Sequence, residues 1–132
     1  MKFTMQRVHY MPKDLIPAVL YVSEEFDIAM HLCACGCGTK TPLGPTEWSV
    51  RETKRGPDLR PSVGNWQQPC QSHYWIDCGE VTWSEKWTAE EIAADRRSEQ
   101  ERRSDYYSAL DRQRGGVLRR FLRRLGGLLR RK

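Results

Sequence analysis

The stretch from His31 to Gly38 constrains this chain most, because it places four potential metal ligands within a few residues. One histidine and three cysteines alternate with other residues there, and two glycines follow the last two cysteines. Buried cysteines often serve as small hydrophobic residues, but three of them in this pattern favour a metal site. Adjacent residues cannot easily saturate one metal, so the segment requires a further ligand from elsewhere in the chain.

A second cluster of suitable side chains follows later in the sequence, where Cys70, Ser72 and His73 supply a thiol, a hydroxyl and an imidazole. The two clusters together offer more sulfur and nitrogen ligands than the four that a tetrahedral zinc ion takes. We therefore expect Zn²⁺ as the cofactor. The expected ligands are Cys33, Cys35, Cys37 and Cys70, with His31 and His73 as alternative ligands.

The cysteine count and the N-terminus favour a cytoplasmic protein. Five cysteines cannot all form pairs, and clustered cysteines in a reducing compartment indicate metal binding or catalysis rather than disulfides. The first residues lack the apolar segment and cleavage site of a signal peptide. The chain also lacks a run of about 18 apolar residues, so no transmembrane helix is expected.

The net charge of +5 comes from the C-terminal segment. Eight of the 22 basic residues lie in residues 114–132, which contain no acidic residue. The other residues carry 14 basic and all 17 acidic side chains, a net charge of −3. The core domain is therefore not expected to bind DNA. The basic amphipathic tail is expected to contact a membrane surface or an acidic partner.

Short segments of alternating polarity dominate residues 1–87 and predict strands. In residues 26–33 we expect Phe26, Ile28, Met30 and Leu32 to face the core, while the opposite face carries His31 and Cys33 toward the site. Residues 41–45 are expected to interrupt regular secondary structure, and residues 61–66 are expected to form an irregular loop. The strands are expected at residues 2–9, 18–22, 26–33, 46–51, 71–77 and 80–83, the last two forming a hairpin.

Helical signals begin after residue 87. Thr88 and Glu91 form a capping box that predicts a polar helix over residues 88–113, and Gly115 with Gly116 is expected to end it. Residues 114–132 are expected to form the basic amphipathic tail. The predicted fold class is α+β, with a small β-rich, zinc-stabilised domain over residues 1–87 followed by C-terminal helices.

Four motifs, taken in order, resemble a bacterial family of unknown function, number 6527. They lie at residues 31–38, 41–43, 59–66 and 69–76, a Val-x-Trp motif follows at residues 81–83, and the resemblance covers about residues 26–90. The resemblance implies a place in a ubiquitin-like conjugation operon, in the position of a deconjugating peptidase. The implied partners are a ubiquitin-like protein and its E1-like and E2-like enzymes, and the implied reaction is hydrolysis of a peptide or isopeptide bond.

Two mechanisms for this implied reaction fit the residues. In the first, zinc carries the attacking water, and Asp27 or Glu47 acts as the base. In the second, four cysteines close a structural zinc site and Ser72 attacks, with His31 or His73 as its base. Asn65 or Ser62 would then orient that base or stabilise the oxyanion.

A non-catalytic alternative also fits the sequence. The same zinc site would then stabilise a protein-interaction module of the ubiquitin-like pathway. Both interpretations predict zinc, so metal content does not distinguish them, whereas turnover of a ubiquitin-like precursor does. The sequence leans toward the peptidase without deciding between the two classes.

Overall fold

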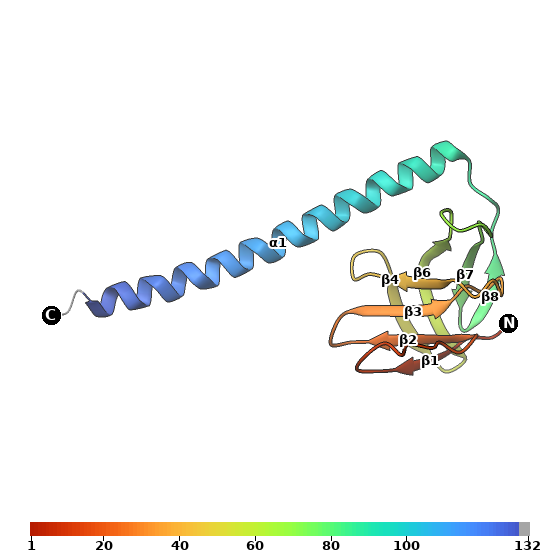
Figure 1. Ribbon diagram of the computed structural model, residues 1–132, viewed down its shortest axis with the longest axis horizontal. Coiled ribbons are helices and arrows are strands. Elements are labelled where there is room, and N and C mark those ends of the chain that lie inside the picture. Colours follow the sequence, from red (N-terminus) through yellow and green to blue (C-terminus); the bar gives the residue numbers. More distant parts are fainter. Residues whose placement is uncertain (130–132) are drawn as a thin grey trace.

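The computed structural model describes residues 1–129 as eight strands followed by one long helix (Figure 1). The strands form two four-stranded sheets, and the predicted α+β class is confirmed. The first sheet contains β1 (Thr4–Arg7), β2 (Val19–Ser23), β3 (Ile28–Leu32) and β4 (Lys40–Leu43). The second contains β5 (Ser49–Thr53), β6 (Gly56–Gly64), β7 (His73–Asp77) and β8 (Glu80–Trp83), and the helix is α1 (Ala89–Leu129).

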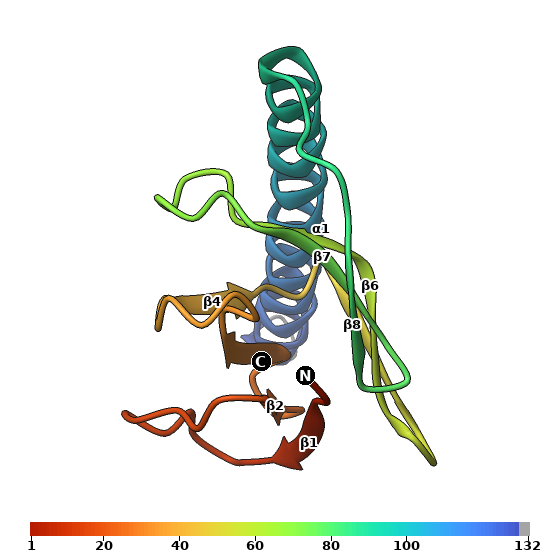
Figure 2. The same ribbon diagram turned by 90° about the vertical axis from the view of Figure 1, so that its right-hand side faces the viewer.

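The two sheets enclose one hydrophobic core (Figure 2). Neighbouring strands within each sheet are consecutive in sequence, and all pairs are antiparallel except β1 with β2. Short antiparallel connections of this kind need only tight turns, which the sequence supplies between most strands. The largest fully buried apolar side chains come from both sheets and from the residue before β1; they are Phe3, Leu20, Pro57, Leu59, Val63, Tyr74 and Ile76.

The face of β3 that packs into the core is the opposite of the one predicted. Phe26 and Ile28 are 47% and 36% exposed, whereas Ala29 and His31 are buried. Both faces of this segment carry apolar residues, so alternation identified the two faces without showing which one the second sheet covers. His31 and Cys33 are both buried, so the face that was expected to point toward a site away from the core packs into the core instead.

Two segments predicted to be irregular are strands. Residues 40–43 form the edge strand β4, which pairs with β3 and includes Pro42. Proline is tolerated there because one side of an edge strand makes no ladder hydrogen bonds. Residues 61–64 belong to β6, whose register against β7 shifts between Leu59 and Val63, so the expected irregularity is a bulge within a strand.

Helix α1 begins at the predicted capping box but does not end where the sequence predicted. The backbone N–H of Glu91 donates to Thr88 Oγ1 at 3.3 Å, and Thr88 N–H donates to Glu91 Oε2 at 2.8 Å. The prediction of a break at Gly115 and Gly116 is wrong, because one helix continues through both residues. Each glycine costs roughly 1 kcal/mol relative to alanine, which a long helix without proline tolerates.

The first turns of α1 lie along the β-domain and the rest extends away from it (Figure 1). Arg103 on the helix forms an ion pair with Glu47, which precedes β5, and a second one with Glu99 one turn earlier at 3.2 Å. Among the described residues, no helix is long and apolar enough to cross a membrane.

Gly79, in the turn between β7 and β8, is expected to tolerate no larger residue. Its φ is +84°, and an added Cβ would lie 2.7 Å from the Phe3 carbonyl oxygen. Replacement by alanine should therefore lower the free energy of unfolding by about 3 kcal/mol, from backbone strain and from the clash. Chemical denaturation measures this loss. Gly38→Ala is the control, since Gly38 has φ +79° but open space around it and should lose only about 1 kcal/mol.

Candidate metal centre and active site

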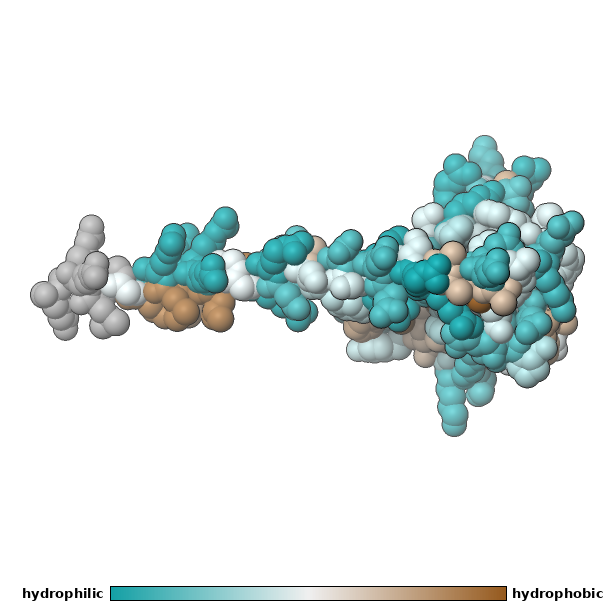
Figure 3. Space-filling view, turned by 90° about the horizontal axis from the view of Figure 1, so that it is seen from above, coloured by the Kyte–Doolittle hydropathy of each residue, from teal (hydrophilic) through white to brown (hydrophobic). Residues whose placement is uncertain are grey.

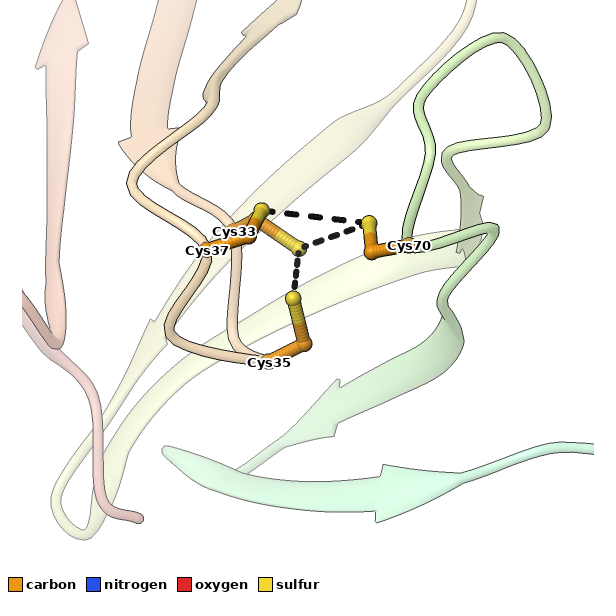
Figure 4. A group of neighbouring side chains, drawn as sticks. All are labelled: Cys33, Cys35, Cys37 and Cys70. Carbon is orange, nitrogen blue, oxygen red and sulfur yellow. Dashed lines mark hydrogen bonds between the residues drawn. The ribbon is translucent and has the colours of Figure 1, made fainter.

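Four cysteine thiols converge at one end of the domain, between the two sheets (Figure 4). Cys33, Cys35 and Cys37 lie in the turn between β3 and β4, and Cys70 lies in the loop between β6 and β7. The sulfur of Cys33 lies 3.3 Å from that of Cys35 and 4.0 Å from that of Cys70. The sulfur of Cys70 lies 3.8 Å from that of Cys37, and all four sulfurs are within 4.8 Å of one another.

This arrangement fits the zinc ion that the sequence predicts. Four sulfurs around a tetrahedral zinc ion, with Zn–S bonds of ~2.3 Å, lie about 3.8 Å from one another. The sulfur separations of 3.3, 3.8 and 4.0 Å lie close to this value. The four thiols, from two separate segments of chain, could therefore hold one metal ion.

Hydrogen bonds around the cluster lower the pKa of two of its thiols, which favours the thiolate form that binds metal. Hydrogen bonds from Thr39 lower the pKa of Cys37 to about 6, and a hydrogen bond from Ser72 lowers the pKa of Cys70. Desolvation instead raises the pKa of Cys35 to about 12, so the metal-free cluster keeps a proton on that sulfur. Zinc binds thiolates, so metal binding should release this proton.

Ser72 and Asn65 lie against the cysteine cluster. The Ser72 hydroxyl is 3.0 Å from Cys33 Sγ and 3.5 Å from Cys70 Sγ. The Asn65 carboxamide donates to Ser72 Oγ at 3.2 Å and to Cys33 Sγ at 3.3 Å. Hydrogen bonds to ligating sulfurs orient them and stabilise their negative charge, so these two residues fit a supporting role around the metal.

His31 is fully buried beneath the cluster and bonds to a tyrosine. Its Nε2 lies 2.8 Å from the Tyr74 hydroxyl, and the Phe3 ring packs edge-on against the imidazole. Burial lowers the pKa of His31 to about 4, so the ring is neutral at physiological pH. His31 therefore lies in the core. It was predicted as a base or a metal ligand, but its contacts are with Tyr74 and Phe3.

His73 forms a different constellation, on the other side of β7 from Tyr74. Its Nε2 lies 2.9 Å from Ser62 Oγ, and its Nδ1 lies 2.7 Å from the backbone carbonyl oxygen of Glu85. The imidazole is buried against two indoles, those of Trp66 and Trp87, whose ring centroids each lie 4.9 Å away and which stack on each other. The Ser62 hydroxyl, the His73 imidazole and the Glu85 carbonyl are therefore connected by two successive hydrogen bonds.

The contact with Glu85 decides which nitrogen of His73 carries the proton. A carbonyl oxygen only accepts hydrogen bonds, so Nδ1 must be protonated. In the neutral imidazole Nε2 then has a free lone pair and accepts the hydroxyl proton of Ser62. This is the tautomer that a histidine needs to act as a general base toward a serine.

The Ser62–His73 pair lines a groove between the β-domain and the first turns of α1. The groove has a volume of about 350 Å³ and includes the indoles of Trp66 and Trp87 on its wall. Charged side chains of α1, among them Glu99 and Arg103, lie along it. A volume of this size accommodates a short peptide segment.

The contact between α1 and the domain at this groove should depend on pH. Desolvation and the neighbouring Glu47 raise the pKa of Glu99 to about 7 from an ordinary value of 4.5. A carboxyl whose pKa is raised by folding opposes folding when it is ionised, so the stability should fall as the pH rises from 4.5 through about 7. Thermal unfolding should show Glu99→Gln gaining stability over the wild type above pH 7 but not below pH 4.5, while Glu101→Gln, on an exposed position nearby, should show no such difference.

The structure brings some of the predicted site residues together and separates others. The four expected metal ligands form one cluster, whereas His31 and His73 contact other residues. Ser72 and His73 are adjacent in sequence but point to different sites, one to the cysteines and one to Ser62. Ser62 was expected only to orient the base or to stabilise the oxyanion, and Glu85 and Trp87 were not expected in the site. The motif at residues 59–66, which contains Ser62, was the one available signal.

The fold and the two sites define a small β-rich domain that combines a four-thiol cluster, able to hold a metal ion, with a serine–histidine pair. Residues 7–84, more than half of the chain, match the model of a family described as bacterial ubiquitination-like system serine protease (BubE). The chain belongs to this family. The match confirms the predicted association with a bacterial ubiquitin-like system, while the family number stays a prediction. The chain matches no curated protein and no solved structure.

Proposed function

We propose that this protein is a serine peptidase that cleaves the peptide or isopeptide bond after the C-terminal tail of a bacterial ubiquitin-like protein. The observation that carries the proposal is the contact of 2.9 Å between Ser62 Oγ and His73 Nε2, with Nδ1 held by the Glu85 carbonyl. The family name supports the same reaction class. We assign the nucleophile to Ser62 rather than Ser72, because the hydroxyl of Ser62 has the imidazole partner.

The reaction follows from these positions. Ser62 Oγ attacks the scissile carbonyl carbon while its proton passes to His73 Nε2. His73 then donates this proton to the leaving amine, the C–N bond breaks, and the tail remains as an ester on Ser62. A water molecule, deprotonated by His73, then attacks the ester carbonyl carbon. His73 returns this proton to Ser62 Oγ as the ester C–O bond breaks, and the released tail ionises to its carboxylate. The Glu85 carbonyl stabilises the imidazolium and keeps the ring oriented, and the two indoles limit access of bulk water.

The cysteine cluster has a structural role in this proposal. Cys33, Cys35, Cys37 and Cys70 would hold Zn²⁺, and a closed set of four thiolates leaves no position for a reacting water. Bound there, the metal supplies folding free energy by joining the turn after β3 to the loop before β7. Asn65 spans the two sites, because its side chain bonds to Cys33 while its residue also lines the groove.

The lining of the groove favours a substrate segment that is extended and narrow. The wall formed by Trp66 and Trp87 suits the apolar and backbone surface of a peptide tail, and charged residues of α1 flank it. The ubiquitin-like protein would be the substrate, and its E1-like and E2-like enzymes would act before this protein in the same pathway. We place the protein in the cytoplasm, where reducing conditions keep the four thiols free for metal.

Turnover and active-site labelling test the proposal together. The full-length protein is incubated with the ubiquitin-like protein of its system carrying a C-terminal peptide extension, and products are identified by mass spectrometry. A fluorophosphonate, which reacts with activated serines, is then added without substrate, and the modified residue is mapped by peptide sequencing.

The expected result is cleavage after the tail and a label on Ser62. A label on Ser72 would overturn the assignment of the nucleophile while supporting a serine peptidase. Absence of both turnover and label, in a folded and metal-loaded protein, would support the non-catalytic interaction module instead.

A further inference from the structure

The distal part of α1 presents an uncovered apolar surface that the proposed peptidase function does not use. Phe121 is 58% exposed, and its apolar neighbours along the helix are exposed to a similar degree. Figure 3 shows these side chains gathered on one side of the helix, with hydrophilic residues on the other. We call this surface the arm face; its members are Val117, Leu118, Phe121, Leu122 and Leu125.

The sequence of this part of α1 separates apolar and basic residues completely. At 100° per residue, the five residues of the arm face occupy one side of the helix. The opposite side carries four arginines, Arg119, Arg120, Arg123 and Arg124. A helix with a wide apolar face and a basic polar face is typical of segments that lie in the interface of a lipid bilayer.

From these observations we infer that the arm face binds an anionic lipid bilayer. The last acidic residue of the chain is Asp111, so the arginine side presents positive charge alone. A negatively charged leaflet attracts each basic residue near its surface and accepts the apolar side chains beneath its headgroups. Pairing with the same segment of a second copy would instead bring arginines at the borders of the two arm faces close together.

The position of the arm face keeps this contact compatible with the groove. Arg103 is the last residue of α1 that lines the groove, and the arm face begins at Val117. Fourteen residues of helix separate these points by about 20 Å. The bilayer would therefore hold the protein by its helix, while the groove at the domain remains accessible to a peptide.

Vesicle sedimentation of the full-length protein tests the inference. Vesicles contain phosphatidylcholine alone or equal amounts of phosphatidylcholine and phosphatidylglycerol. We expect binding to the anionic vesicles, at least tenfold weaker binding to the neutral ones, and release as the salt concentration rises from 0.1 M to 1 M, because the screening length falls from ~10 to ~3 Å. The double substitution Phe121→Ser and Leu122→Ser should weaken binding to anionic vesicles at least tenfold.

Two controls make the result specific. Tyr107→Ser removes an apolar side chain that is 54% exposed on the same helix but outside the arm face, and should leave binding unchanged. Circular dichroism of each variant shows that α1 is still helical. Equal binding to both vesicle types, no binding to either, or an unchanged double variant would each overturn the inference. The inference would also be wrong if the protein formed a dimer in solution that did not bind vesicles and that the double substitution abolished. It would be wrong as well if the arm face bound a purified acidic protein and did not bind vesicles.

Discussion

Replacing Ser62 with alanine is expected to lower kcat for cleavage of a ubiquitin-like fusion by roughly 10³-fold or more, because no other group supplies the attacking oxygen. The same change removes one hydrogen bond from a half-buried side chain, so the free energy of unfolding should fall by only about 1 kcal/mol. Steady-state kinetics and chemical denaturation of the metal-loaded protein measure the two effects separately.

Ser72→Ala is the matched control for this prediction. Ser72 carries a buried hydroxyl in the neighbouring motif at residues 69–76, and its contacts are with Asn65 and the sulfurs of Cys33 and Cys70. Its loss should weaken the metal site and leave kcat of the folded protein within a few-fold of the wild type. The Ser62–His73 assignment is wrong if Ser72→Ala loses turnover while Ser62→Ala retains it.

His73→Gln extends the test to the base. Glutamine keeps a polar group near Ser62 but cannot take up the serine proton, so turnover should fall about as far as in Ser62→Ala, and the double variant should be no worse than either single one. An additive loss in the double variant would show that the two residues act independently, which contradicts a nucleophile–base pair.

The four-thiol cluster was predictable from the sequence, whereas the serine–histidine pair was not. The spacing of Cys33, Cys35 and Cys37 indicates three ligands for one metal ion. A tetrahedral ion needs a fourth ligand, and Cys70 is the cysteine of the second cluster. Ser62 and His73, in contrast, meet because β6 and β7 pair across a register shift between Leu59 and Val63. Sequence carries no direct sign of such a shift.

The α+β class and the helix start were likewise predictable, because each depends on local signals. Thr88 and Glu91 fix the start of α1 through their own hydrogen bonds. The face of β3 and the strand at Pro42 depend instead on which sheet covers which residues. These are properties of tertiary packing, and neither polarity nor proline content reveals them.

Cys70→Ser is expected to abolish stoichiometric zinc binding and to lower the free energy of unfolding by on the order of 4 kcal/mol, because the binding free energy of a structural metal contributes to folding. Cys70 lies in the loop before β7, while the other three ligands lie in the turn after β3, so its loss disconnects two segments that the metal joins. Cys78→Ser is the control: Cys78 lies in the turn between β7 and β8, outside the cluster, and this variant should keep its zinc.

Chelation should reproduce the effect without any substitution. A chelator that removes zinc from the wild type should lower its thermal stability to that of Cys70→Ser, and should have little further effect on that variant. Turnover should disappear together with the fold, since the metal has no role at the Ser62–His73 pair. If a chelator instead stops cleavage in a protein that remains folded and still accepts the fluorophosphonate on Ser62, the metal takes part in the reaction, and the structural role assigned to the four cysteines is wrong.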